Sequence, residues 1–373
     1  MMAASANDLP ARRIPALDGL RAVSIALVLV GHLGGTRNFA SLPGIEIAGD
    51  VANLGVTIFF VISGFLITSL LLKEESQTGT VSLRSFYARR AFRILPALGL
   101  YLSVIALAAV ITAAIRIPSA DWLHAVTFTM NYHQQRGWWL GHLWSLSVEE
   151  QFYFLWPAAI VLLGRTRSFR LAALAVGFAP LWRVAAWWLW PDGRAAIGET
   201  FPTVVDAIAV GCLLAAGAEW LAGRPGYRRF LASPTFVAVP ALVLICNALD
   251  RYPSFYFTAG MTFRNLGIAA IVHWAILGSN RTATAWLDAP VVRFIGRASY
   301  SLYLWQQPFL NRHSVGLVAA FPLNITCAFA CAVASFAFIE TPALRLRERI
   351  GLDGGRVPAS AHHTTSTTVL SAT

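Results

Sequence analysis

Arg21 and His32 are ionisable side chains within an apolar segment that has the composition of a membrane helix. They bound the stretch "RAVSIALVLVGH", whose ten intervening residues carry no ionisable group. Such residues are costly inside a membrane and mark candidate functional sites. In a helix they would lie roughly 16 Å apart along the axis. A neutral imidazole at His32 could act as a general base. The alternatives are an interhelical hydrogen bond for His32 and, for Arg21, an interfacial cation paired with Asp18.

A second group of polar residues opens the segment "GHLWSLSVEEQFYFLW", residues 141–156. His142, Ser145 and Glu149 follow at steps of three and four, so a helix would place them near one face. Glu149 would lie about 10 Å from His142 along the axis, at a depth comparable to that of His32. A carboxylate beside a neutral imidazole orients the ring and stabilises the imidazolium. We therefore expect Glu149 to assist His32, with the lining of an aqueous entrance by Glu149 and Glu150 as the alternative.

Three arginines cluster in "FYARRAFRILP", residues 86–96. Arg89, Arg90 and Arg93 would share one side of a helix start at the cytoplasmic surface. Cations are unfavourable at a helix amino terminus, and like charges one turn apart repel each other. An anionic partner should relieve this repulsion. A phosphorylated ligand and anionic lipid headgroups satisfy the requirement equally well.

The elements that position these residues are predicted to be membrane helices. The 373-residue chain is 57% hydrophobic and only 13% charged, whereas a soluble domain has about 25% charged residues. The sequence therefore predicts an all-α, polytopic membrane protein with about ten transmembrane helices. Apolar spans of about 20 residues are expected at 17–35, 51–72, 94–115, 142–163, 170–190, 203–221, 231–249, 263–279, 295–312 and 316–339.

The net charge of +11 does not require a nucleic-acid partner. If the amino terminus is cytoplasmic, most basic residues fall in or beside cytoplasmic loops, which is the positive-inside pattern. Ten spans then place both termini in the cytoplasm. We expect one membrane domain, residues 1–347, and a disordered cytoplasmic tail, residues 348–373. The four cysteines lack metal-ligand or disulfide spacing, and no zinc-binding H-E-x-x-H motif occurs, so no metal is expected.

Six stretches in order resemble the signatures of the acyltransferase-three family, integral-membrane O-acyltransferases that are mostly bacterial. They are "LDGLRAVSIALVLVGH", "GVTIFFVISGFLIT", "YARRAFRILP", "GHLWSLSVEEQFY", "GRASYSLYLWQQP" and "FIETPALR", and the resemblance runs from about residue 14 to residue 347. The resemblance implies a protein of the bacterial inner membrane. It also implies transfer of an acyl group, commonly acetyl, from coenzyme A on the cytoplasmic side to a hydroxyl, often of an extracytoplasmic glycan.

The resemblance assigns the chemistry to His32 and an essential acid to Glu149. Donor binding would fall to Arg21 and the three clustered arginines, with Ser63 of "VISGF" on the thioester path or, alternatively, in close helix packing. Substrate or support roles would fall to His142, Ser145, Asp18 and Gln306. The chain departs from the family pattern at three positions. Gln306 replaces a frequent histidine, Thr57 a frequent acid, and Val205 a frequent arginine before Asp206.

Some alternatives stay open at this stage. The acyl group could pass directly to the acceptor or through an acyl-histidine intermediate. The acceptor could be a cell-surface or lipid-linked glycan or a macrolide-like small molecule. A transporter would also bury His, Glu and Arg, but should show an internal repeat or paired interrupted helices, and the sequence shows neither.

Overall fold

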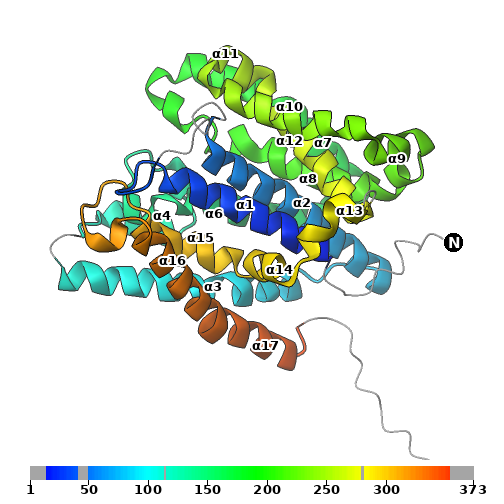
Figure 1. Ribbon diagram of the computed structural model, residues 1–373. Helices are drawn as coiled ribbons and strands as arrows, with labels where there is room; N and C mark the ends of the chain where they lie inside the picture. The colour runs from blue at the N-terminus through cyan, green and yellow to red at the C-terminus, as the bar shows by residue number, and fades with distance from the viewer. Residues whose placement is uncertain (1–13, 41–48, 113–114, 279–280, 353–373) are drawn as a thin grey trace, which may run out of the picture.

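The computed structural model describes residues 14–40, 49–112, 115–278 and 281–352, and within these ranges it is helical without any strand (Figure 1). The long helices are α1 (Pro15–Leu33), α2 (Val51–Thr78), α3 (Leu83–Ile111), α6 (Leu143–Leu163), α7 (Arg165–Leu189), α8 (Phe201–Ala222) and α12 (Met261–Leu277). The shorter helices are α4 (Ser119–Val126), α5 (Trp138–Gly141), α9 (Pro225–Ala232), α10 (Ala238–Ala248), α11 (Pro253–Phe255), α13 (Arg281–Thr284), α14 (Pro290–Arg297), α15 (Ser299–Phe309), α16 (Leu323–Ser335) and α17 (Thr341–Arg349).

Nine helical stretches in the described ranges are long and apolar enough to cross a membrane, which confirms an all-α polytopic fold. The predicted span at 295–312 is the exception. It is divided between the end of α14 and the eleven residues of α15. Eleven residues extend only about 16 Å, roughly half of a hydrocarbon core. This segment is therefore not a membrane-crossing helix in itself.

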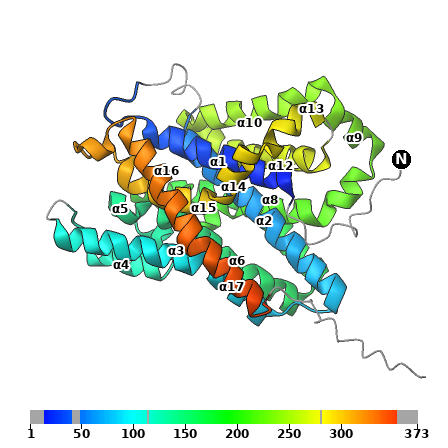
Figure 2. The same cartoon turned by 60° about the horizontal axis from the view of Figure 1, so that its bottom comes forward.

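The short helix α15 nevertheless lies alongside α1 in the interior of the bundle. Arg21 of α1 contacts Ser299, and His32 of α1 contacts Gln306. From the first contact to the second, the residue number rises along both α1 and α15, so the two helices run parallel (Figures 1 and 2). All but two of the eleven residues of α15 are buried. The helix α15 therefore lies where a spanning segment was predicted, and neighbouring helices cover it.

The central helix α2 packs against both α1 and α8. Small residues permit the close approach of α2 and α8. A Cβ atom on Gly64 would collide with the carbonyl oxygen of Ile208, and one on Gly211 with the carbonyl oxygen of Val61. Such close contacts between backbones are a common basis of helix association in membranes. Lipid tails are as apolar as the helix surface, so the hydrophobic effect does not drive the helices together. Gly64 thus has a packing role beside the candidate site residue Ser63.

The turn between α2 and α3 lies at the same end of the bundle as the end of α17. The helix α2 stops at Gly79, whose φ of 75° is in the left-handed region that glycine tolerates. Ser82 then caps α3, and Arg89 in its second turn donates to the carbonyl oxygen of Leu352 at 3.2 Å. The start of α2 lies at the opposite end, because its 28 residues extend about 42 Å. Most of the predicted tail, from residue 353 on, is outside the described residues.

Candidate active site

A narrow cavity of about 100 Å³ lies inside the bundle between α1, α2, α3, α6 and α15. Its polar lining includes Arg21, Ser63, Arg90, Arg93, Glu149 and Tyr303. The sequence singled out all of these except Tyr303, and the fold brings them together from five helices. Because about 10–15 Å³ of such volume holds one water molecule, the cavity has room for about seven to ten. It is a site for a small group rather than for a whole nucleotide.

Glu149 is held in this cavity by Ser63. The Ser63 hydroxyl donates a hydrogen bond of 2.6 Å to Oε1 of Glu149. A charge-assisted bond of this length fixes the carboxylate in one orientation. Ser63 is therefore part of the candidate site, where it orients the Glu149 carboxylate. The expected contact between Glu149 and His32 is not formed, so the assistance predicted from their similar depth is wrong as a direct interaction.

The arginine cluster of α3 is compensated within the chain. Arg89 pairs with Glu74 at 2.6 Å, and Arg93 pairs with Glu340 at 2.7 Å. Arg90 lies 3.8 Å from Glu150 and stacks over the ring of Tyr153, 3.7 Å from its centroid. Three carboxylates from other helices therefore relieve the repulsion that the sequence pattern indicated. Neither a phosphate nor a lipid headgroup is required to explain the cluster.

Glu340 reaches this cluster from a widened turn of helix. Residues Phe336–Glu340 form a π-helical segment between α16 and α17. Such segments are often found at functional sites. The Glu340 side chain is buried, and it accepts a hydrogen bond of 3.0 Å from Ser301 in addition to its ion pair with Arg93. This buried pair joins α3, α15 and the carboxyl-terminal helix.

Arg21 differs from the three arginines of α3 because it has no carboxylate partner in the described part of the chain. Its guanidinium donates two hydrogen bonds to the Ser299 hydroxyl, at 3.1 and 3.3 Å. The ion pair with Asp18, which was the alternative for Arg21, is not formed, and Oδ2 of Asp18 has no hydrogen-bond partner among the described residues. Arg21 therefore presents a cation to the cavity that the surrounding protein leaves available for a ligand.

A chain of three hydrogen bonds determines the tautomer of His32. The carbonyl oxygen of Trp138 can only accept, so the Gln307 amide nitrogen, 2.6 Å away, must face it. Gln307 Oε1 then accepts from Nε2 of Gln306 at 3.0 Å. Gln306 Oε1 is left to accept from Nδ1 of His32 at 2.8 Å. The proton of a neutral His32 therefore lies on Nδ1, and Nε2 keeps the lone pair that a general base requires.

Three side chains, Ser145, Tyr303 and His142, form a layer of mutual contacts beside the cavity, and His32 is not among the residues that line the cavity. Tyr303 lines the cavity and donates to the carbonyl oxygen of His142, while Ser145 lies 2.6 Å from the Tyr303 hydroxyl. The His142 ring packs against those of Tyr101 and Tyr303, with both centroid distances 5.4 Å. Neither of its nitrogens has a hydrogen-bond partner among the residues described. Ser145 and Glu149 share the cavity as predicted, whereas His142 lies behind it.

Several residues of the site were not identified from the sequence. Ser299 and Tyr303 belong to the quoted stretch "GRASYSLYLWQQP", so their motif was noticed but their roles were not. Arg264, at the start of the predicted span 263–279, was not singled out, and its side chain is only 1% exposed. In the described ranges, no cluster of three or more His, Cys, Asp and Glu residues could hold a metal ion.

Comparison with known proteins gives a consistent set of similarities. Residues 14–340 match a family described as "Acyltransferase domain". A Staphylococcus aureus (strain COL) protein provisionally named an O-acetyltransferase is 31% identical, and the alignment covers 89% of this chain and 57% of that protein. The peptidoglycan O-acetyltransferase OatA of Listeria monocytogenes is 26% identical, with 88% and 55% covered. The chain thus spans little more than half the length of these relatives. No solved structure is significantly similar.

Proposed function

The chain belongs to the acyltransferase domain family, and on that premise we propose that it is a membrane O-acyltransferase. The proposed reaction moves an acyl group, commonly acetyl, from acyl-CoA to a hydroxyl of a glycan on the outer side of the membrane. One observation carries this proposal. Arg21, which lacks an anionic partner among the described residues, faces the cavity that also holds Glu149, while His32 on the same helix keeps Nε2 free.

The donor would enter from the end of the bundle where the arginines of α3 lie. The cavity has room for the acyl thioester but not for the nucleotide of coenzyme A, which would remain outside it. A cation without an anionic partner is suited to bind the donor and to stabilise negative charge that develops on the thioester oxygen. Arg21 is the residue in that position. Arg90 has the longest ion pair of the α3 cluster, so it would lose least by turning to a phosphate.

The acceptor would be activated by His32. Its Nε2 removes the hydroxyl proton while the hydroxyl oxygen attacks the thioester carbonyl. The carbon–sulfur bond then breaks, and the coenzyme A thiolate leaves and takes up a proton. Gln306 supports this role because its carbonyl oxygen holds Nδ1–H in both the neutral and the protonated state of the ring. The frequent histidine of the family can be replaced here because an amide oxygen also accepts this hydrogen bond.

The layer of Ser145, Tyr303 and His142 must open for the thioester to reach the acceptor hydroxyl at His32, and the same holds if the acyl group passes first to Nε2 of His32. The Tyr303 hydroxyl holds this layer through contacts with two partners. We expect donor binding to displace it, as in other enzymes whose catalytic groups are completed by closure. An acyl group carried on Nε2 of His32 would be the covalent alternative.

Two further features support an outward-facing glycan as acceptor. A relative of this chain is named a peptidoglycan O-acetyltransferase. The start of α1 and the end of α17 lie at one end of the bundle, which fits both termini in the cytoplasm and His32 toward the outside (Figure 2). We accordingly place the protein in the bacterial cytoplasmic membrane. A small-molecule acceptor is the alternative for the same site.

The experiment that tests the proposal uses the purified chain in lipid vesicles, with labelled acetyl-CoA on one side and a soluble peptidoglycan fragment on the other. We expect label to appear in the glycan as a base-labile ester. Hydrolysis of acetyl-CoA without labelled glycan would contradict the acceptor class. No consumption of acetyl-CoA at all would contradict the proposed activity.

A further inference from the structure

A second polar cavity lies between α2, α6, α8 and α12, and it has no place in the mechanism above. Its volume is about 10 Å³, and its polar lining includes Asp206, Arg264 and Asn265. All three side chains are at most 1% exposed. Burial of two charged groups and an amide around an internal space calls for an occupant that completes their hydrogen bonds.

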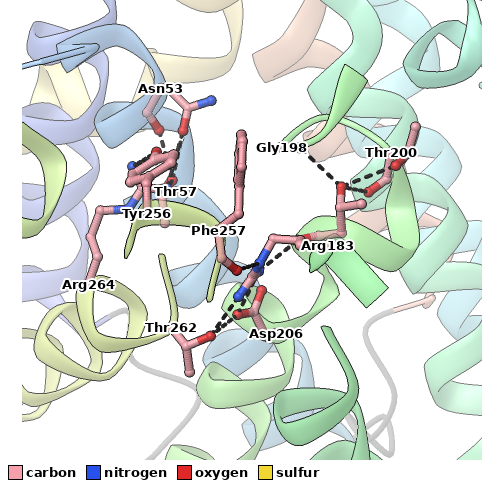
Figure 3. Close-up of polar contacts among 11 residues, drawn as sticks. Asn53, Thr57, Arg183, Gly198, Thr200, Asp206, Tyr256, Phe257, Thr262 and Arg264 are labelled. Atoms are coloured by element: carbon pink, nitrogen blue, oxygen red, sulfur yellow. Dashed lines mark hydrogen bonds and ion pairs between the residues drawn. The ribbon is translucent and has the colours of Figure 1, made fainter. Parts of the chain in front are cut away.

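On one side of this cavity, Asp206 belongs to a buried ion pair. Arg183 of α7 lies 3.1 Å from Oδ2 of Asp206, and it also donates to the carbonyl oxygen of Phe257 at 2.9 Å (Figure 3). The same Oδ2 accepts a hydrogen bond of 2.8 Å from Thr262. Phe257 lies in the π-helical segment Tyr256–Gly260, where the altered backbone pattern leaves its carbonyl oxygen available. One carboxylate oxygen is thus fully occupied, and Oδ1 has no partner.

On the other side, Arg264 is a buried cation whose partners in the described chain are all neutral. Its Nη1 donates to Asn247 and Tyr256, both at 2.8 Å. Its Nη2 lies 2.9 Å from Thr57 and 3.3 Å from Asn53 (Figure 3). The Thr57 hydroxyl stands where the family often has an acid. The Nε atom of Arg264 has no hydrogen-bond partner in the part of the chain that the structure describes.

The unpartnered atoms define what the occupant must be. Arg264 Nε offers a hydrogen, whereas Oδ1 of Asp206 and Oδ1 of Asn265 each need one. A group that both donates and accepts fits this set: a water molecule can accept from Arg264 and donate to both oxygens, and a hydroxyl can accept from Arg264 and donate to one of them. A carboxylate or phosphate is disfavoured because it would face the carboxylate of Asp206. The volume of about 10 Å³ is close to the minimum for one water-sized group.

The second cavity adjoins the first through a shared aromatic wall. Phe60 lines both cavities, and its ring meets that of Trp144 edge to face at 6.2 Å. Asn53, which also lines the second cavity, is the third residue of α2. This cavity therefore lies toward the end of α2 opposite to the arginines of α3, on the side from which the acceptor would approach.

We propose that this cavity is an acceptor subsite that binds a sugar hydroxyl other than the one that is acylated. The inference rests on the proposed function. The hydroxyl donates to Asn265, accepts from Arg264, and takes the place of one water molecule. The sugar to which it belongs packs on the wall formed by Phe60 and Trp144. The subsite thereby selects polyhydroxylated acceptors and fixes which hydroxyl reaches the thioester.

The test measures acetyl transfer from acetyl-CoA to a soluble peptidoglycan disaccharide by wild type and Asn265→Leu. Leucine approximates the shape of asparagine but cannot accept a hydrogen bond, and Asn265 makes no ion pair whose loss would disturb the fold. We expect the acceptor KM to rise about 5- to 10-fold, the effect of one hydrogen bond, with an unchanged KM for acetyl-CoA. Asn324→Leu is the matched control, because Asn324 is equally buried but bonds only within its own segment.

A second arm uses disaccharides in which one hydroxyl at a time is replaced by hydrogen. For one of these, wild type should show the same rise in KM, and Asn265→Leu should add no further loss, because both changes remove one interaction. An unchanged acceptor KM in Asn265→Leu, or losses that multiply for every analogue, would identify a resident water and overturn the subsite. If wild type hydrolyses acetyl-CoA but acylates no disaccharide, the proposed acceptor class fails and the subsite with it.

Discussion

The Nδ1 atom of His32 lies 2.8 Å from Oε1 of Gln306, at the end of a hydrogen-bond chain that begins at a main-chain carbonyl. Because that carbonyl can only accept, the direction of every bond in the chain follows from it. The contact explains how a glutamine serves where a related protein often has a histidine. It also leaves Nε2 of His32 as the basic atom.

Substitutions of Gln306 should therefore test whether this residue acts by orienting the His32 ring. We expect Gln306→Leu to lower kcat for acyl transfer by about 10- to 100-fold, because the His32 ring loses the acceptor that fixes its tautomer, within the range of general-base effects. Gln306→His should retain most of the rate, since an imidazole nitrogen can accept the same hydrogen bond. Steady-state transfer assays distinguish these results. Equal losses in both variants would show that the amide has another role.

Arg21 and Arg89 provide a matched pair for the donor site. Arg21 faces the cavity without a carboxylate partner in the described chain, whereas Arg89 is bound to Glu74. We expect Arg21→Ala to raise the KM for acetyl-CoA about tenfold or more, the loss of a charge-assisted contact. Arg89→Ala should change it by less than about threefold. If the second substitution weakens donor binding as much as the first, the α3 cluster rather than Arg21 carries donor recognition.

The buried pair of Arg183 and Asp206 should contribute to stability in a way that depends on both members. Both side chains are 0% exposed, so removal of one leaves an uncompensated charge. We expect Arg183→Ala to cost about 3–5 kcal/mol, measured as a lower Tm of the detergent-solubilised protein. The double variant Arg183→Met with Asp206→Leu should recover much of this loss. A double variant as unstable as Arg183→Ala would show that the contacts to Thr203 and Phe257 matter more than the charge pair.

Two glycines of α8 test the close packing of α2 and α8. A Cβ atom on Gly211 would lie 2.8 Å from the Phe65 nitrogen, whereas one on Gly217 would meet nothing within 4 Å. We expect Gly211→Ala to destabilise the solubilised protein by about 1–3 kcal/mol, as overpacking does. Gly217→Ala should leave the Tm unchanged or slightly raised. Similar melting temperatures for the two variants would argue against backbone contact as the determinant of this interface.

The sequence was a good guide to features that depend on one helix alone. Apolar runs of the right length located nine spanning stretches, and helical rise alone placed Arg21 and His32 at two depths. The division of the predicted span at 295–312 was not foreseen, because a hydropathy average does not distinguish a short buried helix from a spanning one. The fold class was therefore more predictable than the path of the chain near α15.

Partners contributed by other helices could not be predicted. Glu149 and His32 were expected to be in contact because they lie at similar depths in the membrane. Depth does not determine where a side chain lies around the bundle axis, and in the structure Glu149 is hydrogen-bonded to Ser63. The arginines of α3 pointed to an external anion because Glu74, Glu150 and Glu340 are distant in sequence. Arg264 lies near the start of a predicted span, and the sequence did not indicate its partners Asn53 and Asn247, which come from other helices.

The most direct test of the account is acetyl transfer by His32→Ala in lipid vesicles, compared with wild type and with donor binding measured in parallel. If Nε2 of His32 is the base, transfer to the glycan should fall at least about 100-fold. The Kd for acetyl-CoA should stay within about twofold of wild type, because His32 does not line the donor cavity. Transfer at the wild-type rate by His32→Ala would contradict the central assignment.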